Sequence, residues 1–424
     1  MRTILYAVAA ASFGCSPFGG GAFNCTDDSQ CTRGGMAGTC QGTGFCSFAD
    51  DTCPSGQRYG DSSGGLGGVC VGDEPPSDAR SDGVTASCVI DGLDLCDETP
   101  LPAIAVGASE TIDTDTDPRC ITFPQAGGGD ACLVYAQAIS VAAGQTLSAI
   151  GSRPLVIASV ASITLAGELD VSSRRGGQTG AAANHSACTI DREAESDLGG
   201  AAGAAGGSFG GEGGDGGDGD TDNSLGNDGN AVKGDASDAL AAAPAFARGG
   251  CRGANGGNET GPGGGNGGGG GASGGAALLV ANDMIEVSGA IRAMGAGGSG
   301  GGDQAGGGGG GSGGFIKLAA TALTISGSIS ANGGGGGEGG CNCSGVETPG
   351  NPGTDGALGT GAAGGGAGAS GPGGDGGASG AATPPDGLDG SPSVVGSGGG
   401  GGGAGFVVFV GTVTITGVVS PPPE

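Results

Sequence analysis

The sequence has no tryptophan, three tyrosines and one histidine in 424 residues, and aromatic residues make up 3% of the chain. Large aromatic side chains usually dominate cores and binding hot spots, so their scarcity excludes an ordinary aromatic core. Any core must be aliphatic and local. A catalytic triad or dyad that needs an imidazole would have to use His185, which lies in a polar stretch (AANHSACTI) that we read as a solvated loop.

Basic residues are also scarce, with 14 Lys and Arg against 43 Asp and Glu and a formal net charge of −29. A chain this acidic repels nucleic acid and anionic membranes at long range. We therefore expect no nucleic-acid partner, and membrane contact only through an N-terminal lipid anchor. A cell-surface glycan or protein is the partner that the charge permits.

No catalytic residues are predicted. Matches to the nucleophile motif G-x-S-x-G, such as residues 271–275, lack the strand and helix that must flank a nucleophile elbow. They are expected by chance, because 110 residues are glycine. For the same reason, matches to the glycine-rich dinucleotide-binding motif G-x-G-x-x-G do not indicate a nucleotide site.

Fifteen cysteines beside one histidine favour disulfides over zinc, and hence an oxidising compartment. Residues 1–14 are typical of a signal peptide: Arg2 precedes an apolar stretch, residues 4–11, that is too short to span a bilayer. The following Ser12-Phe13-Gly14-Cys15 resembles the bacterial lipobox, which would make Cys15 the lipidated first residue of an outer-membrane or cell-surface lipoprotein. Plain secretion after ordinary cleavage is the alternative.

The other 14 cysteines can pair completely, and they define the domain organisation. Residues 15–71 are expected to form a disulfide module, residues 72–87 an acidic, proline-containing linker, and residues 88–132 a second small cap. The cysteines expected in disulfides are Cys25, Cys31, Cys40, Cys46, Cys53 and Cys70 in the module, Cys88, Cys96, Cys120 and Cys132 in the cap, and Cys188, Cys251, Cys341 and Cys343 beyond it. The run CSFADDTCPSGQRYG, with CVG from Cys70, resembles segments of exported Cys-rich and Gly-rich (lipo)proteins of myxobacteria, a resemblance that implies export and names no activity.

Residues 133–424 carry a repeat of short aliphatic strands, anchored on Gly167, Gly289, Gly327 and Gly417. The aliphatic positions keep a period of two on one face across each glycine, and the other face is mostly polar. These aliphatic residues are Ile163, Leu165 and Leu169; Ile285, Val287 and Ile291; Leu323, Ile325 and Ile329; and Val413, Ile415 and Val419. We expect a mainly β fold with the strands stacked in parallel, each anchoring glycine lying where a Cβ would obstruct the next strand. The pattern resembles a short right-handed parallel β-helix, or β-solenoid.

Long glycine-rich insertions, residues 176–273, 295–313 and 332–405, separate these strands. Glycine loses the most conformational entropy on ordering, which favours disorder. Alternatively, the tracts form bundles of extended, polyglycine-II-like helices, whose close approach only glycine permits. We expect Cys188 and Cys251 to tether the first insertion to itself or to Cys341 and Cys343.

Calcium is the one metal with support at the level of residues, and no other cofactor is expected. Residues 210–215 fit the start of an RTX-type nonapeptide, and Asp218, Asp220 and Asp222 are spaced like the first ligands of an EF loop. Both matches fail further along, where Gly229 replaces the final Glu. The sequence thus predicts at most a weak site formed by Asp215, Asp218, Asp220 and Asp222, against a simple solvated acidic tract.

Taken together, these features predict a non-enzymatic structural or adhesive lipoprotein at the cell surface. The alternative is a carbohydrate-binding or polysaccharide-lyase-type β-helix protein, since Glu168 and Asp170 share one strand face. Their counterparts in the other repeats, Ala290 and Arg292 in the next one, do not continue a carboxylate groove.

Overall fold

A computed structural model gives the backbone of residues 25–41, 44–60, 63, 66–72, 89–90, 93–220, 230–343, 346–367, 373–383 and 386–424. The chain divides into two compact units, Met1–Val84 and Thr85–Glu424. The expected signal peptide, Cys15, linker residues 73–87, Cys88 and Asp222 lie outside the described residues, as do the side chain of Cys343 and residues 221–229 of the first insertion. The part of the chain that is described contains no helix that could span a membrane.

The first unit is a small antiparallel module held by disulfides. Its elements are the 3-10 helix η1 Asp28–Gln30 and the strands β1 Thr32–Arg33, β2 Met36–Ala37, β3 Thr39–Cys40, β4 Cys46–Ala49 and β5 Gln57–Tyr59. Strands β1 and β2 form one antiparallel pair, and β3, β4 and β5 form a three-stranded sheet. The disulfides are Cys25–Cys40, Cys31–Cys46 and Cys53–Cys70. The cysteines themselves supply most of the buried cluster, so this unit depends on covalent links.

The second unit is also built from strands, and no α-helix occurs among its described residues. They are β6 Val89–Ile90, β7 Leu93–Asp94, β8 Ile104–Val106, β9 Glu110–Asp113, β10 Ile121–Phe123, β11 Ala131–Ala136, β12 Ile139–Val141, β13 Thr146–Ile150, β14 Leu155–Ser159, β15 Ser162–Leu165, β16 Glu168–Asp170, β17 Ala276–Ala281, β18 Met284–Val287, β19 Ala290–Arg292, β20 Phe315–Ile325, β21 Ser328–Ser330, β22 Cys341–Cys343, β23 Val346–Thr348, β24 Phe406–Ile415 and β25 Val418–Ser420.

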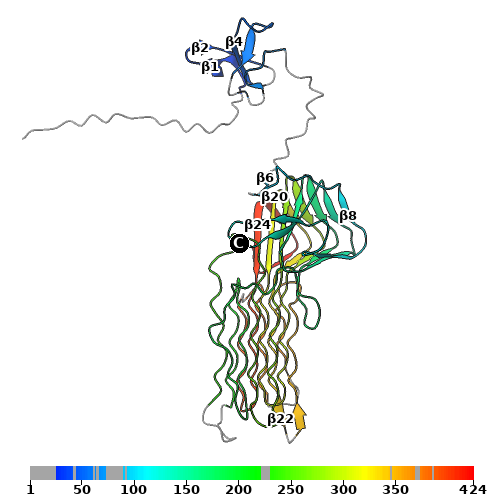
Figure 1. Ribbon diagram of the computed structural model, residues 1–424, viewed down its shortest axis with the longest axis vertical. Helices are drawn as coiled ribbons and strands as arrows, with labels where there is room; N and C mark the ends of the chain where they lie inside the picture. The colour runs from blue at the N-terminus through cyan, green and yellow to red at the C-terminus, as the bar shows by residue number, and fades with distance from the viewer. Residues whose placement is uncertain are drawn as a thin grey trace, which may run out of the picture. The chain divides into compact units, whose positions relative to one another are not determined.

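Most of these strands form three parallel ladders. The first runs β11-β14-β17-β20-β24, and the second runs β8-β12-β15-β18 and then continues onto the same β20 and β24. The third runs β9-β13-β16-β19-β21-β25. Because β20 and β24 are long enough to take part in two ladders, those ladders join into one curled sheet (Figure 1).

The strand register predicted from the sequence is confirmed. Ile163 pairs with Ile285, Ile285 with Leu323, and Leu323 with Val413, all in parallel. All but the last of these side chains are buried in one aliphatic cluster between the ladders. The stack begins before residue 133, because β8 and β9 of segment 88–132 pair with β12 and β13.

The anchoring glycines also stack as predicted. A Cβ built on Gly289 would lie nearer than 3.0 Å to the carbonyl oxygen of Gly167, and the same holds for Gly327 over Gly289 and Gly417 over Gly327. Real Cβ atoms essentially never come this close to another heavy atom. Each glycine is therefore required by the strand below it.

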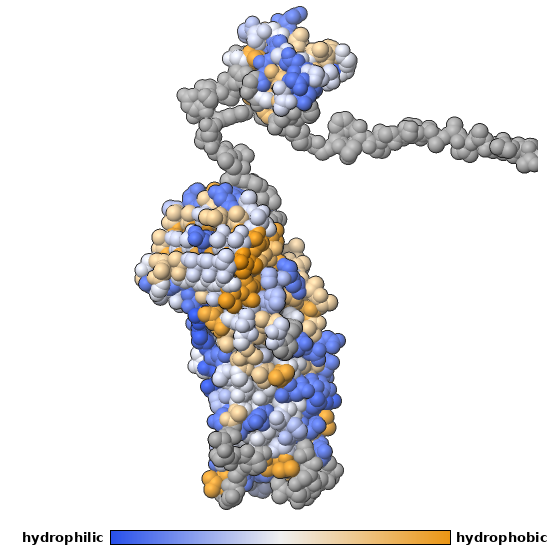
Figure 2. Space-filling view, turned by 180° about the vertical axis from the view of Figure 1, so that it is seen from behind, coloured by the Kyte–Doolittle hydropathy of each residue, from blue (hydrophilic) through white to orange (hydrophobic). Residues whose placement is uncertain are grey.

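The ladders end at β24 and β25, where apolar side chains remain exposed. Val413, Ile415 and Val418 are each 37–44% exposed, whereas Leu323 and Ile325, the partners of Val413 and Ile415 in β20, are buried. No described strand pairs with β24 beyond β20. Figure 2 shows hydrophobic residues gathered on the strand-bearing part, while hydrophilic residues border the glycine-rich part.

The described parts of the glycine-rich insertions are extended segments that run side by side away from the strands (Figure 1). Segment 306–314 lies among six others, and its N–H groups point to three of them in turn. Gly306, Gly309 and Ser312 donate to Gly257, Ala254 and Cys251; Gly307, Gly310 and Gly313 to Ser397, Gly400 and Gly403; Gly308, Gly311 and Gly314 to Ser299, Ala296 and Ala293. Its carbonyl oxygens accept from segments 268–274, 204–207 and 334–337.

Of the two outcomes expected for the insertions, the described residues thus follow the extended, mutually hydrogen-bonded one. A donor that returns to the same neighbour at every third residue means three residues per turn. Backbone groups that would otherwise need water are satisfied within the bundle. The number of neighbours also explains the composition: a Cβ on any of residues 306–311 would lie nearer than 3.0 Å to a carbonyl oxygen.

Outer segments have fewer neighbours and tolerate a side chain at every third position. In residues 213–218 (GGDGGD), a Cβ on any of the four glycines would lie within 3.0 Å of a carbonyl oxygen. The two aspartates, by contrast, keep part of their side chains accessible to solvent. In these two segments, uninterrupted glycine goes with an inner position and Gly-Gly-Asp with an outer one.

Candidate functional site

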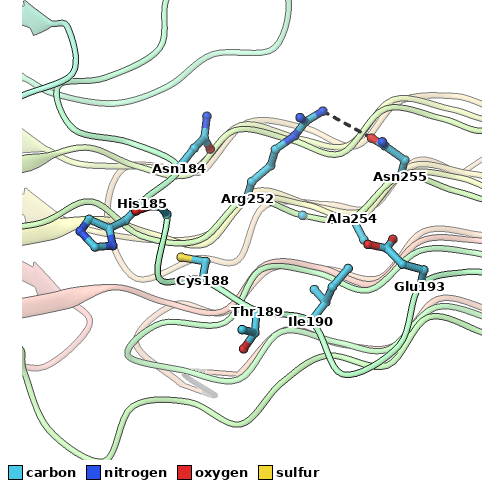
Figure 3. Close-up of a pocket in the computed structure, with 11 residues that line it drawn as sticks. Asn184, His185, Cys188, Thr189, Ile190, Glu193, Arg252, Ala254 and Asn255 are labelled. Carbon is cyan, nitrogen blue, oxygen red and sulfur yellow. Dashed lines mark hydrogen bonds between the residues drawn. The ribbon is translucent and has the colours of Figure 1, made fainter.

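A polar cavity of the second unit lies beside the Cys188–Cys251 disulfide (Figure 3). We call it the disulfide pocket. It encloses about 360 Å³ and is lined by Asn184, His185, Ser186, Cys188, Thr189, Ile190, Glu193, Arg252, Gly253, Ala254 and Asn255. The disulfide ties the chain at 184–193 to a glycine segment, so one covalent link fixes both sides of the pocket.

One side of the pocket follows from the threefold repeat. Arg252 and Asn255 are three residues apart on the same extended segment, so their side chains leave it in the same direction. The Asn255 Oδ1 accepts from the backbone N–H of Gly270 at 3.0 Å and from Arg252 Nη2 at 3.3 Å, the contact drawn in Figure 3. Arg252 Nε also donates to the Gly270 carbonyl at 3.3 Å. These bonds fix both polar side chains against the neighbouring segment.

His185 is half-buried rather than fully solvated as its sequence context suggested. Its Nδ1 accepts from the backbone N–H of Ala187 at 3.2 Å and lies 3.1 Å from Arg248 Nη1. A guanidinium can only donate, so Nδ1 is the acceptor and the ring carries its proton on Nε2. Burial, with the nearby Arg248 charge, lowers the pKa of His185. The ring is therefore held neutral in a structural role.

The aspartates considered for calcium are mostly engaged with the backbone of neighbouring segments. Asp215 accepts from the backbone N–H of Ala236 at 2.9 Å and pairs with Lys233 Nζ at 2.7 Å. Asp218 accepts from the backbone N–H of Lys233 at 3.0 Å, and Asp220 is fully buried. The Asp215 and Asp218 carboxylates thus satisfy backbone N–H groups of Ala236 and Lys233.

Within the described residues, the one cluster close enough to hold a metal is Cys25, Cys31 and Cys40. All three are disulfide-bonded and so cannot supply thiolates. Asp215, Asp218 and Asp220 are not brought together as a ligand set among the residues described. The calcium site stays a prediction from the sequence.

Glu168 and Asp170, the carboxylates of the lyase alternative, are each neutralised by an arginine. Arg292 Nε lies 2.7 Å from Glu168 Oε1, and Arg174 Nη2 donates to Asp170 Oδ2 at 2.6 Å. Burial raises the pKa of Glu168, an effect that the Arg292 charge opposes. The strand repeat indicated the shared face but not Arg174, which follows the strand as i+4 to Asp170.

The second unit also has the disulfide Cys120–Cys132, and Cys188–Cys251 joins the first insertion to itself, one of the two expected tethers. Cys96 and Cys341 are disulfide-bonded as well. Multiple disulfides place the protein in an oxidising or extracellular compartment. Comparisons of the chain with protein-family models, with curated proteins and with solved structures find no match.

Proposed function

We propose that this protein is a non-enzymatic structural or adhesive element of a bacterial cell surface, anchored through a lipid on Cys15. In this proposal the three ladders are the faces of a short β-solenoid, and the glycine segments extend it as a polyglycine-II-like bundle. The first unit then lies next to the anchor in the sequence.

The observation that carries the proposal is the set of six neighbours around segment 306–314. This segment is bonded on all sides through its backbone and carries one side chain, the buried Ser312 hydroxyl, so it offers no catalytic cleft. It can form a stiff scaffold that presents polar side chains only on its outer segments, at every third residue. Such a scaffold suits display or adhesion, and the acidic surface keeps it soluble.

Anchorage and exposure are tested together by metabolic labelling with a fatty acid and by protease treatment of intact cells. We expect label on the wild-type protein, no label on Cys15→Ala, and cleavage of the second unit from outside the cell. A Cys25→Ala variant controls for loss of a cysteine elsewhere. Unlabelled wild-type protein, or a second unit protected in intact cells, would reject the surface lipoprotein.

The lyase alternative is less well supported because Glu168 and Asp170 are already paired with Arg292 and Arg174. It makes a distinct claim, namely that the purified protein forms unsaturated products from a polyuronate. Ultraviolet absorbance of such products, lost in Glu168→Gln, would favour the alternative over the scaffold.

A further inference from the structure

Arg248 carries a buried charge that no carboxylate of the described residues neutralises. The residue is 7% exposed, and it forms no ion pair with a carboxylate of the described residues. Its contacts are the ring of Phe209, 4.9 Å from the guanidinium carbon to the centroid, and His185 Nδ1 at 3.1 Å. Burying an unpaired charge is costly, and carboxylates are abundant in this chain. The burial of Arg248 without a carboxylate partner among the described residues therefore needs an explanation.

Arg248 lines a second cavity, which shares Cys188 and Thr189 with the disulfide pocket. We call it the arginine cavity. It encloses about 290 Å³ and is lined by Ala187, Cys188, Thr189, Asp191, Ser208, Ser237, Asp238, Leu240, Arg248 and Cys251. This volume is near the lower end for sites that hold one small molecule, about 300 Å³.

The polar groups of the arginine cavity differ in what they can bind. The Arg248 guanidinium offers a planar fork of donors that matches a carboxylate in bidentate geometry. Asp191 and Asp238 offer only acceptors when ionised, so they suit hydroxyl groups and repel a second anion. Ser208 already accepts from the backbone N–H of Gly213, and Ser237 donates to the Thr189 carbonyl. The site thus fits a ligand with one acidic group and several hydroxyls.

We propose that the arginine cavity binds a sugar acid, with its carboxylate on Arg248 and its hydroxyls on Asp191 and Asp238. The net charge of the chain does not prevent this, because charges more than about 8 Å away are largely screened at physiological salt. The site does not depend on a lipid at Cys15 or on surface display, so it can hold or fail independently of the proposed function.

The test is calorimetric titration of the oxidised protein with D-galacturonate, its neutral counterpart D-galactose, and acetate. We expect D-galacturonate to bind at least tenfold more tightly than either of the other two. Arg248→Lys keeps the charge and the contact with Phe209 but loses the fork, and should weaken binding at least tenfold. Arg252→Lys, in the adjoining disulfide pocket, is the matched control and should bind as the wild type does.

A second variant keeps the test decisive if Arg248→Lys fails to fold. Asp238→Asn replaces an exposed acceptor on the rim and should weaken D-galacturonate binding severalfold. Equal binding of D-galactose and D-galacturonate would overturn the role of Arg248. If acetate binds as tightly as D-galacturonate, the cavity is a simple anion site and the proposed recognition of sugar hydroxyls is wrong. If none of the three compounds binds, the arginine cavity is not a binding site.

Discussion

A Cβ placed on Gly270 would lie nearer than 3.0 Å to the carbonyl oxygen of Gly253, whereas one placed on Gly269 would meet nothing nearer than 3.9 Å. The two glycines are adjacent in a run that looks uniform in the sequence. Only the arrangement of neighbouring segments distinguishes them. Gly270 faces another segment, and Gly269 faces an open side.

Alanine substitutions at these two positions should therefore differ sharply. In Gly270→Ala the clash is with a backbone oxygen that cannot rotate away, so we expect a loss of about 3 kcal/mol or more in the free energy of unfolding. Gly269→Ala should be unchanged or slightly more stable, because alanine restricts the unfolded chain. Urea unfolding of the two variants beside the wild type measures the difference. Equal stability of the two would contradict the close packing of the glycine segments.

Removing the Cys188–Cys251 disulfide should destabilise the second unit strongly. The bond closes a loop with a sequence separation of 63 residues. The chain-entropy relation gives about 4 kcal/mol for a loop of this length. The double variant Cys188→Ser, Cys251→Ser should lower the unfolding midpoint of the second unit. The matched variant Cys53→Ser, Cys70→Ser, which removes a bond of the first unit, should leave that midpoint in place.

The first unit should lose stability in acid because of Asp50. This carboxylate accepts from Thr52 Oγ1 and the Thr52 backbone N–H and pairs with Arg58 Nε at 2.6 Å. Led by the Thr52 hydroxyl bond, these interactions lower the pKa of Asp50 from 3.8 to about 2. A pKa lower in the folded state means stability that is complete above about pH 4 and is lost as the pH falls toward about 2.

Fluorescence of the buried Tyr59 reports on this unit in a Tyr135→Phe background, which removes the buried tyrosine of the second unit. Between pH 5 and pH 2 the thermal unfolding midpoint of the first unit should fall less in Asp50→Asn than in the protein that keeps Asp50. Asp51→Asn removes a neighbouring exposed carboxylate and should leave the acid sensitivity intact. Identical profiles in all three proteins would exclude Asp50 as the source.

Reduction should separate the two units by their protease resistance. The first unit has three disulfides and little apolar burial, so dithiothreitol should make it sensitive to protease. The ladders and glycine segments of the second unit are held by backbone hydrogen bonds and an aliphatic cluster, so a large fragment of this unit should resist longer. A first unit that stays resistant after reduction would show that its core does not need the bonds.

The strand register could be predicted because its signal is local and repeated. Each repeat carries alternating aliphatic residues around one glycine. Stacking the repeats in register buries the aliphatic faces of all of them together. The membership of β8 and β9 in the stack was not predicted, because in β9 Glu110 and Asp113 interrupt the pattern around the buried Ile112, and β8 carries only Ile104 and Val106. Their membership depends on pairing with β12 and β13 rather than on their own residues.

The order of the glycine tracts could not be read from any one tract. Taken alone, residues 306–311 cannot offset the entropy of ordering, and disorder is the natural expectation. The balance changes only when distant segments such as 397–403 and 251–257 supply the hydrogen-bond partners. A signal was nevertheless present, in the contrast between unbroken glycine and the Gly-Gly-Asp pattern of residues 213–218.

The candidate site residues also divide into those that a local sequence pattern indicates and those that only the fold brings together. The sequence indicated Glu168 and Asp170 from their shared strand face, and it indicated the Cys188–Cys251 disulfide as one of two possible tethers of the first insertion. It did not indicate Arg248, which meets His185 across 63 residues of chain and Phe209 across 39. No local pattern connects these three residues, so only the folded structure reveals that Arg248 has no carboxylate partner among the described residues.

The threefold repeat of the glycine segments restricts how this protein can change in length. Each triplet advances a segment by about 9 Å at about 3.1 Å per residue. Deleting a single residue within 213–218 would rotate every later side chain of this segment by a third of a turn. Asp218 would then point into a packed neighbouring segment. Growth or shortening is tolerated only in steps of three amino acids, made in adjoining segments together.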